Sequence, residues 1–251
     1  MASIGIIGSE GRMGRAIAEA VAASRHELAG GVDRAGDAGD LAGRCDVLVD
    51  FSSPAALPAN LAAAAAAGTP MLIGTTGLSA SDHALIDGRA QEIAVLQTGN
   101  TSLGVTLLAS LVREASARLG PEWDVEILEM HHRMKVDAPS GTALLLGEAA
   151  AQGRGIDLSV NSRSGRDGHT GQRETGTIGF AALRGGTVAG DHSVILAGEQ
   201  ERITLSHHAE DRSIFARGAL RGAEWLIGRA PGRYGMEDVL GLGSRQNAGF
   251  A

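Results

Sequence analysis

The chain is short of cysteine, of positive charge and of long apolar runs, and each shortage excludes a class of function. Its single cysteine, Cys45, leaves no partner for an internal disulfide and no set of thiolates for a metal cluster. Cys45 directly precedes the largely apolar segment Asp46–Phe51, so we expect a small buried hydrophobe there and not a reactive thiol.

Positive charge is outnumbered, because 22 lysines and arginines face 29 aspartates and glutamates, for a formal net charge of −7. This sign argues against a general nucleic-acid binder, whose surface must attract phosphates. Any anion-binding site must therefore be local, built from a few converging cations and the N-termini of helices.

The longest apolar tract, Leu61–Gly68, is alanine-rich and too short to cross a bilayer. The first residues enter an apolar, strand-like run at once, without the basic segment, apolar run and cleavage site of a secretory signal. We expect a cytoplasmic protein that does not contact membranes.

Glycine is abundant, with 37 residues among 251, about double the usual share. Many tight turns or close backbone approaches are therefore expected. The first hundred residues alternate apolar runs with helical periodicity, which predicts an α/β fold with a parallel, doubly wound sheet. The expected strands are Ile4–Ile7, Glu27–Val32, Val47–Phe51, Pro70–Ile73 and Ala94–Gln97, and the expected helices are Arg12–Ser24, Leu57–Ala67 and Ser81–Ile93.

After Asn100 the pattern changes and predicts a second domain built on a mixed or antiparallel sheet. The expected elements are a helix at Leu103–Leu119, a strand at Trp123–Met130, a helix at Ser140–Gln152 and glycine-rich strands between Asn161 and Leu205. A last helical pattern, Ile214–Ile227, is inferred to pack back on the first domain, with Arg245–Ala251 as a frayed tail.

The first strand-to-helix turn, residues 8–14, reads Gly-Ser-Glu-Gly-Arg-Met-Gly, a G-x-x-G-x-x-G variant of the dinucleotide-binding fingerprint. Gly8 permits the tight turn, Gly11 lets the backbone approach a pyrophosphate, and Gly14 allows close packing of helix on sheet. Asp33 ends the second expected strand, 19 residues beyond Gly14, where an acid accepts hydrogen bonds from ribose hydroxyls. This arrangement predicts a Rossmann-like dinucleotide-binding domain.

We assign residues 1–102 and 213–251 to this domain, and residues 103–212 to a second α+β domain on a mixed sheet. Arg34 leaves the choice of cofactor open, because its guanidinium can stack on adenine or pair with a 2′-phosphate. NADH and NADPH are both compatible with it. The competing interpretation of Asp33 and Arg34 is an ordinary surface loop with a solvated ion pair.

Residues 129–142, Glu-Met-His-His-Arg-Met-Lys-Val-Asp-Ala-Pro-Ser-Gly-Thr, gather proton-transfer and cationic groups in one short segment. The adjacent His131 and His132 can exchange protons near neutral pH, and Lys135 adds a fixed charge. Adjacent residues of a strand point to opposite faces, although at a strand end both can border one pocket. Each side chain alone is more commonly packed or solvated, but the cluster favours an active site.

A helix entry follows these cations. Pro139 suits such an entry, Ser140 can cap the helix, and Gly141 and Thr142 can present N–H groups to a carboxylate or phosphate. Together with the nucleotide motif, this segment predicts an enzyme that reduces a small acidic substrate.

Several segments match one known family of enzymes. They are Gly-Arg-Met-Gly at 11–14, Gly-Thr-Thr-Gly at 74–77, the block 129–143, Gly-Thr-Ile-Gly at 176–179, Arg-Gly-Gly at 184–186, Gly-Asp-His at 190–192, Arg212 and Gly-Ala-Leu at 218–220. On these segments, which extend nearly end to end, the chain resembles the 4-hydroxy-tetrahydrodipicolinate reductases (dihydrodipicolinate reductases) of the bacterial diaminopimelate and lysine pathway.

The resemblance implies transfer of hydride from NADH or NADPH to a small cyclic dicarboxylate, in a homotetramer whose second domain binds substrate and mediates tetramerisation. It implies His131 as the proton donor and Lys135 as a second catalytic residue that also binds substrate. The other residues implied to bind substrate are His132, Ser140, Gly141, Thr142 and Arg212. The residues implied to hold the cofactor are Gly8, Ser9, Glu10, Gly11, Arg12 and Met13 at the pyrophosphate, Asp33 and Arg34 at the adenosine, and Gly74, Thr75, Thr76, Thr98, Gly99, Asn100 and Thr101 on the nicotinamide side.

Three features depart from the family pattern. Glu10 places a carboxylate near the expected pyrophosphate, which weakens binding unless the side chain turns outward or Arg12 offsets it. Met134 replaces a third histidine found in some relatives. The segment between Asp33 and Cys45 is shorter than in many relatives, which leaves the cofactor preference open.

Two other functions stay open at this point. An NAD-dependent amino-acid dehydrogenase, such as an aspartate dehydrogenase, would oxidise its amino acid with NAD. A non-catalytic NAD(P)H-binding sensor would keep the motif at residues 8–14 but would not need His131, Lys135 and the helix entry together. No metal is expected, because neither His131 nor His132 is followed by a carboxylate or histidine at the i+4 spacing that zinc sites on helices favour.

Overall fold

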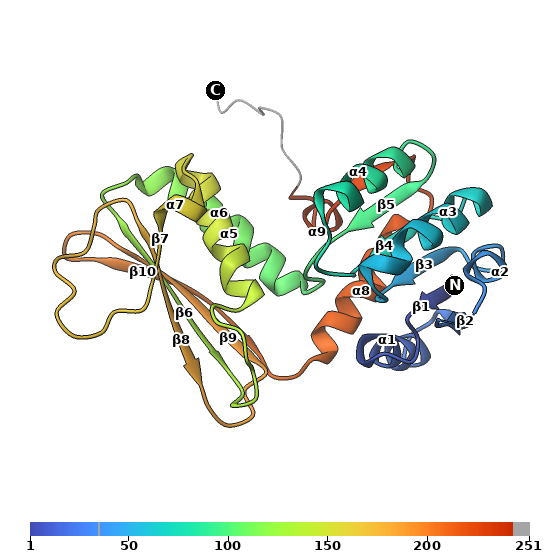
Figure 1. Cartoon of the computed structure of the whole chain (residues 1–251), viewed down its shortest axis with the longest axis horizontal. Helices are drawn as coiled ribbons and strands as arrows, with labels where there is room; N and C mark the ends of the chain where they lie inside the picture. Colours follow the sequence, from blue (N-terminus) through green and yellow to red (C-terminus); the bar gives the residue numbers. More distant parts are fainter. Residues whose placement is uncertain (35, 243–251) are drawn as a thin grey trace. The chain divides into compact units, whose positions relative to one another are not determined.

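Two β-sheets organise the chain, one in each of two units that differ in strand direction (Figure 1). The computed structural model describes residues 1–34 and 36–242, so the tail predicted at Arg245–Ala251 lies outside the described residues. The first unit contains Met1–Leu103 and the chain from Ser213 onward, and the second contains Gly104–Arg212.

The first unit is built on a six-stranded sheet in the order β11-β5-β4-β3-β1-β2, and every neighbouring pair of strands is parallel. The strands are β1 (Ser3–Ile7), β2 (Glu27–Val32), β3 (Val47–Asp50), β4 (Met71–Ile73), β5 (Ala94–Gln97) and β11 (Gly232–Tyr234). The strand order reverses between β1 and β3, and open α/β sheets bind ligands beyond the carboxyl ends of the strands at such a reversal. The predicted Rossmann-like sheet is confirmed.

Helices cover both faces of this sheet, because parallel strands are joined by crossover connections. One face carries α1 (Arg12–Ala22), α8 (Ser213–Leu226) and α9 (Met236–Val239), and the other carries α2 (Ala38–Ala42), α3 (Leu57–Ala67) and α4 (Ala80–Arg89), with a 3₁₀ turn at Pro54–Ala56. Helix α8, expected at Ile214–Ile227, packs against α1 in this unit, as inferred from the sequence. Cys45 is half-buried beside α2, where burial raises the pKa of its thiol.

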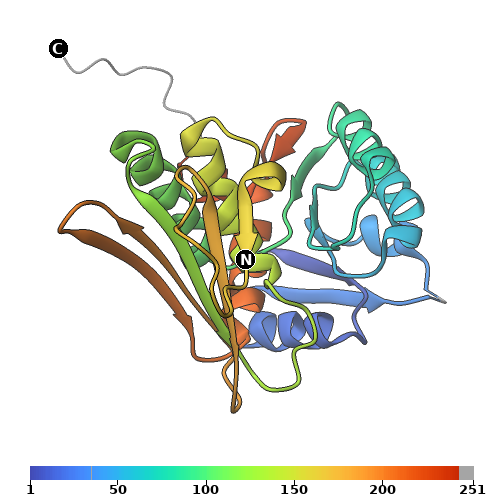
Figure 2. The same cartoon turned by 60° about the vertical axis from the view of Figure 1, so that its left-hand side comes forward.

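The second unit is built on a mixed five-stranded sheet in the order β10-β9-β6-β8-β7. Strand β6 pairs parallel with β8 and antiparallel with β9, so the predicted mixed sheet is confirmed. The elements are α5 (Leu103–Leu119), β6 (Asp124–His131), α6 (Gly141–Arg154), α7 (Leu158–Asn161), β7 (Ser162–Ser164), β8 (Ile178–Arg184), β9 (Gly190–Ala197) and β10 (Arg202–Ala209). Helices α5 and α6 lie on one face of this sheet (Figure 2).

Strand β6 carries polar side chains into the core of the second unit. Its residues alternate between the two faces of the sheet, and Val125 and Ile127 fill the first two inward positions with apolar side chains. Glu129 and His131 fill the next two. Because an unpaired polar group in a core costs folding free energy, other elements must supply hydrogen-bond partners at this end of β6.

The periodicity of the sequence does not predict several short elements, namely α2, α7, α9 and β11. None is longer than five residues, too few for a helical or strand period to emerge. Capping defines two of them instead, because the Asp37 side chain accepts from backbone N–H groups of α2 and Asp157 does so for α7.

No described helix combines the length and the apolar character that crossing a membrane requires.

Candidate active site

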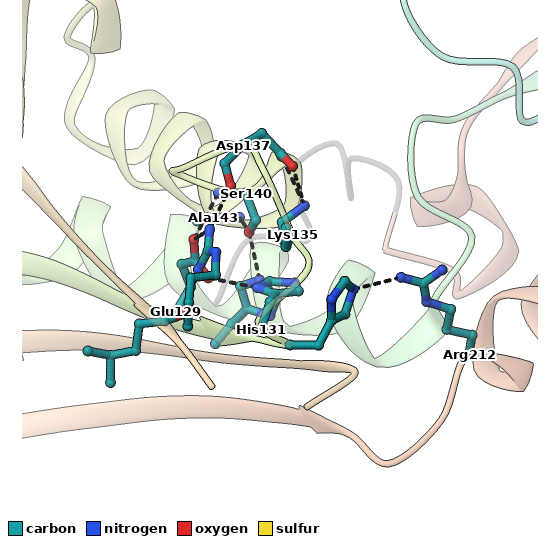
Figure 3. A network of polar contacts seen from close by, with 11 residues as sticks. Glu129, His131, Lys135, Asp137, Ser140, Ala143 and Arg212 are labelled. Carbon is teal, nitrogen blue, oxygen red and sulfur yellow. Dashed lines mark hydrogen bonds and ion pairs between the residues drawn. The ribbon is translucent and has the colours of Figure 1, made fainter. Parts of the chain in front are cut away.

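A buried carboxylate and an imidazole meet at the carboxyl end of β6 (Figure 3). His131 Nδ1 lies 2.7 Å from Glu129 Oε2, and the Glu129 side chain is 1% exposed. Arg184, the last residue of β8, donates to both oxygens of Glu129 over 2.8 Å each. The backbone N–H of Ser140 donates to Oε1 over 3.2 Å. The fold thus supplies the buried carboxylate with partners from three segments.

These contacts decide the protonation of the pair. Burial alone would raise the pKa of Glu129, but hydrogen bonds from Arg184 and His131 outweigh it and hold that pKa below its usual range. Glu129 is therefore a carboxylate near neutral pH, and an anionic acceptor at Nδ1 assigns the proton of a neutral His131 to Nδ1. Nε2 is then the atom through which His131 can exchange protons.

A second histidine borders the pair. The rings of His131 and His192 meet edge to face, with centroids 5.1 Å apart and an interplanar angle of 75°. His192 Nε2 lies 2.9 Å from Ser140 Oγ, and Ser140 Oγ accepts from Ala143 N over 3.1 Å, which confirms Ser140 as the cap of α6. Burial, aided by the nearby His131, lowers the pKa of His192 to about 4, so this ring is neutral at neutral pH.

The loop after β6 holds the remaining cations of the segment. His132 Nε2 lies 3.2 Å from Arg212 Nη2, and both residues line a pocket of about 540 Å³ with Arg133 and Met134. His131 is not among the residues that line this pocket, so the two adjacent histidines point apart, as strand alternation demands. The Met134 side chain is largely exposed and joins none of these polar contacts.

Lys135 is held by a side chain of its own loop. Its Nζ lies 2.8 Å and 2.9 Å from the two oxygens of Asp137, and its hydrogen bond lowers the pKa of that carboxyl. Gly141 and Thr142 form the first turn of α6, where backbone N–H groups of a helix bind anions. A Cβ added at Gly141 would meet nothing within 4 Å, so its backbone stays open to a ligand.

The glycine turn of the first unit has the geometry that its sequence predicts. Gly8 has φ +82°, in the left-handed region that favours glycine. A Cβ at Gly14 would lie 2.2 Å from the carbonyl oxygen of Gly8, so only glycine lets α1 approach the turn this closely. Asp33 Oδ2 accepts from Ser9 Oγ over 3.1 Å and from Glu10 N over 2.7 Å, which ties the end of β2 to the turn.

Glu10 does not leave an uncompensated carboxylate at this turn. Its Oε2 pairs with Arg15 Nη2 over 3.1 Å, and both side chains are exposed. The compensating cation is therefore Arg15, one turn further along α1, and not Arg12. Arg12 and Met13 open α1, where the first-turn backbone N–H groups favour a phosphate.

A pocket of about 710 Å³ lies at the carboxyl ends of β1, β2 and β3, where its walls include Gly8, Gly11, Asp33 and Arg34. It has the setting and glycine-lined wall that a dinucleotide requires. Phe51, Ser52, Ser53 and Asn60 are among the other lining residues, which the sequence did not predict at the cofactor. The signal that could have found them is their position, because they follow the carboxyl end of β3.

The walls of that pocket do not include the other residues expected at the pyrophosphate, namely Ser9, Glu10, Arg12 and Met13. The residues expected on the nicotinamide side follow β4 and β5 at the same edge of the sheet, also outside those walls. Several of them use their side chains in structural hydrogen bonds. Thr75 Oγ1 donates to the buried Asp50 over 3.3 Å, and Thr101 Oγ1 donates to the carbonyl oxygen of Phe215 over 2.7 Å. Gly74, Thr76 and Thr98–Asn100 complete this set on the two strand ends.

Glu129, Arg184 and His192 are also absent from the residues that the sequence singles out for chemistry. Glu129 had a usable signal, because it lies two residues before His131 and so shares its face of β6.

Among the described residues, no group of three His, Cys, Asp or Glu side chains could hold a metal ion.

The geometry can be compared with known proteins. The family model described as the N-terminus of dihydrodipicolinate reductase matches residues 2–101, and the model of its C-terminus matches residues 104–240. Two curated relatives named 4-hydroxy-tetrahydrodipicolinate reductase, from Zymomonas mobilis subsp. mobilis and Acidiphilium cryptum, are each 55% identical, with coverage of 95% of this chain and 97% of theirs. A solved dihydrodipicolinate reductase from Paenisporosarcina sp. TG-14, bound to dipicolinate, shares the fold with a TM-score of 0.74 at 24% identity, over 95% of this chain and 99% of that one.

Proposed function

The chain belongs to the dihydrodipicolinate reductase family, and we propose that it reduces 4-hydroxy-tetrahydrodipicolinate, by way of dihydrodipicolinate, to tetrahydrodipicolinate. It is an NAD(P)H-dependent oxidoreductase of the diaminopimelate and lysine pathway. The observation that carries the assignment of the site is the segment 129–142, where an imidazole backed by a buried carboxylate adjoins a lysine and the first turn of a helix.

The cofactor-binding residues proposed are those at the carboxyl ends of the parallel strands. The turn at residues 8–13 would hold the pyrophosphate, Asp33 and Arg34 the adenosine, and the ends of β4 and β5, residues 74–76 and 98–101, the nicotinamide side. The narrow approach of Gly14 to Gly8 and the pocket beside Asp33 fit such a ligand. When bound, the reduced nicotinamide supplies a hydride.

His131 is proposed as the group that supplies the proton. Hydride addition to a conjugated C=C–C=N ring places negative charge on the enamine-like carbon and nitrogen, and a proton must follow. An imidazole exchanges protons near neutral pH, and Glu129 at Nδ1 leaves Nε2 as its exchanging atom.

The substrate has two carboxylates, and the same segment offers cations and N–H donors to them. We assign Lys135 and the α6 entry at Ser140, Gly141 and Thr142 to this task, with His132 and Arg212 on the wall of the adjacent pocket. Lys135 contributes both charge and position, because an ammonium near the ring also stabilises negative charge that develops in the transition state.

The oligomer is a further part of the proposal. We propose a homotetramer assembled through the second unit, acting in the cytoplasm. The face of its sheet opposite α5 and α6 carries Leu128, Met130, Leu183 and Ile195, which share that face by strand alternation and register. Light scattering of the purified chain tests the tetramer, and a monomer at micromolar concentration would contradict it.

A coupled assay tests the function. The cyclic product of pyruvate and aspartate semialdehyde is supplied, and oxidation of NADH and NADPH is followed separately by absorbance. Turnover with at least one cofactor is expected, and replacement of His131 by Gln should lower it by roughly 10²–10⁴-fold. An enzyme that instead oxidises aspartate with NAD would belong to the dehydrogenase alternative, and cofactor binding without any turnover would favour the sensor.

A further inference from the structure

We propose that Glu129, clamped by Arg184, is the positioning residue of the proton donor. It fixes the Nδ1–H form of the neutral His131 ring and stabilises the imidazolium that gives up its proton from Nε2. This inference rests on the proposed role of His131. The proton moves from Nε2 to the reduced substrate, the Nδ1–H···Glu129 bond persists throughout, and water then restores the proton at Nε2.

Hydrogen bonds hold the Glu129 carboxylate in one orientation. Oε2 contacts His131 Nδ1 and Arg184 Nη1, and Oε1 contacts Arg184 Nη2 and Ser140 N, all within 2.7–3.2 Å. These donors come from β6, β8 and the entry of α6, so rotation of the carboxylate would break contacts with three elements. A fork-like pair of bonds from arginine fixes the plane of a carboxylate as well as its position. The fixed carboxylate in turn sets the plane of the His131 ring through its contact with Nδ1.

The opposite edge of the ring, at Nε2, faces a glycine. A Cβ at Gly190, the first residue of β9, would lie 3.0 Å from His131 Nε2. Glycine at this position therefore avoids a side chain against the atom that must exchange the proton. His192 packs on the His131 ring by its edge, and its other contact is Ser140, so it does not compete for Glu129.

Few charged or titratable groups surround the His131 ring in the part of the chain that the structure describes. They are Glu129 on its own strand, Arg184 on β8, His192 on β9, which burial keeps neutral, and the Lys135–Asp137 pair in the loop after β6. Glu129 is the one anion among them in direct contact with the ring. Removal of its charge should make the imidazolium harder to form, whereas removal of Arg184 should not.

The test is the pH dependence of kcat/KM for the full-length enzyme with NADH and the cyclic substrate. A general acid must be protonated, so kcat/KM falls at high pH, along the basic limb of the pH profile. In E129Q, kcat/KM should fall by up to roughly 10⁴-fold, the loss that follows when the carboxylate orienting a reacting imidazole becomes an amide. The basic limb should also move to lower pH, because the anion that favours the imidazolium is gone. In R184Q, which keeps the carboxylate, the limb should not move to lower pH.

Glu126 provides a matched control on the same strand. Its carboxylate also accepts from arginines, through two 2.8 Å bonds from Arg166 and one 2.8 Å bond from Arg173 Nε. It lies on the face of β6 opposite to His131. The limb of E126Q should stay at its wild-type position. An equal shift in E126Q and E129Q, or a shift to lower pH in R184Q, would mean general damage to the sheet and would overturn the inference.

Two further readouts keep the outcomes separate. If E129Q does not fold, ¹⁵N shifts of His131 in the wild-type enzyme decide the point: the Nδ1–H form supports the inference and the Nε2–H form overturns it. H131Q separates this inference from the proposed function. Full turnover in H131Q would show that His131 is not the proton donor. If H131Q is slow but the basic limb of E129Q stays at its wild-type pH, only the role of Glu129 is refuted.

Discussion

At the residue scale, the contact between Lys135 and Asp137 bears on the binding role proposed for Lys135. The ammonium is already held by both oxygens of a carboxylate whose side chain is 57% exposed. A substrate carboxylate that binds Lys135 shares this ammonium with Asp137, so the loop carries an internal competitor for its own cation. Because this pair is exposed, its own contribution to stability is small.

Replacing Asp137 by Asn should therefore lower KM for the cyclic substrate severalfold and leave kcat within about twofold. The backbone carbonyl of Asp137, which accepts from Arg184 over 2.6 Å, is retained in this variant. Steady-state kinetics at saturating NADH measures both constants. A higher KM in D137N would show that Asp137 assists binding, contrary to this expectation.

Replacing Lys135 by Ala should raise KM and also lower kcat, because charge and position are lost together. A loss of roughly 10²-fold or more in kcat/KM is expected if the ammonium acts in the transition state. D137N is its matched control, since both variants remove the same ion pair. Unchanged substrate affinity in K135A would contradict the assignment.

At the element scale, the glycine turn after β1 shows how far a sequence motif determines geometry. Gly14 is required because the carbonyl of Gly8 occupies the space of its side chain. By contrast, a Cβ at Gly88, near the end of α4, would meet nothing within 4 Å. The two helical glycines thus predict opposite effects of the same substitution.

Gly14→Ala should destabilise the chain by about 1–3 kcal/mol, the usual range for overpacking, and weaken cofactor binding because the turn must widen. Gly88→Ala should be neutral or stabilise by up to about 1 kcal/mol, because alanine loses less backbone entropy in a helix. Urea denaturation and NADH fluorescence titration measure the two properties. Wild-type behaviour of G14A in both would refute the close approach of α1 to the turn.

Local sequence was sufficient where the determining contacts are local. Turn glycines, the cap at Ser140 and the alternation of β6 all act within a few residues. The predicted α/β architecture followed from another local signal, the alternation of apolar runs with helical periodicity. Local sequence could not predict the partners of Glu129. Arg184 lies 55 residues away and meets the same face only because β8 pairs with β6 in the register that aligns Arg184 with His131. Register is set by the whole sheet, so no local sequence pattern predicts the contact between Arg184 and Glu129.

At the scale of the whole molecule, the buried His192 links stability to pH. Its pKa is lowered to about 4 in the folded chain, whereas a histidine in the unfolded chain titrates near 6.5. Between these values the unfolded state binds more protons, so the free energy of unfolding rises with pH. His207, whose pKa burial also lowers, acts in the same direction.

We therefore expect the midpoint of thermal unfolding to fall as the pH is lowered from 7 toward 4.5. The full contribution of His192 is roughly 3 kcal/mol, from the difference between the two pKa values. H192Q should lose much of this slope. Calorimetry across the pH range gives the result, and an identical slope in H192Q would show that His192 is not the group responsible. The lowered pKa values of Glu126 and Glu129 act at lower pH, because those carboxylates lose their contribution only when protonated.

The proposed function assigns cofactor binding to the strand ends of the first unit and substrate binding to the segment 129–142 of the second. A crystal structure with reduced cofactor and pyridine-2,6-dicarboxylate tests it most directly. It should show the pyrophosphate at the first turn of α1, one ligand carboxylate on Lys135 and the N–H groups of Gly141 and Thr142, and His131 Nε2 directed at the ligand ring. A dicarboxylate bound elsewhere, or a His131 ring turned away from it, would contradict the account.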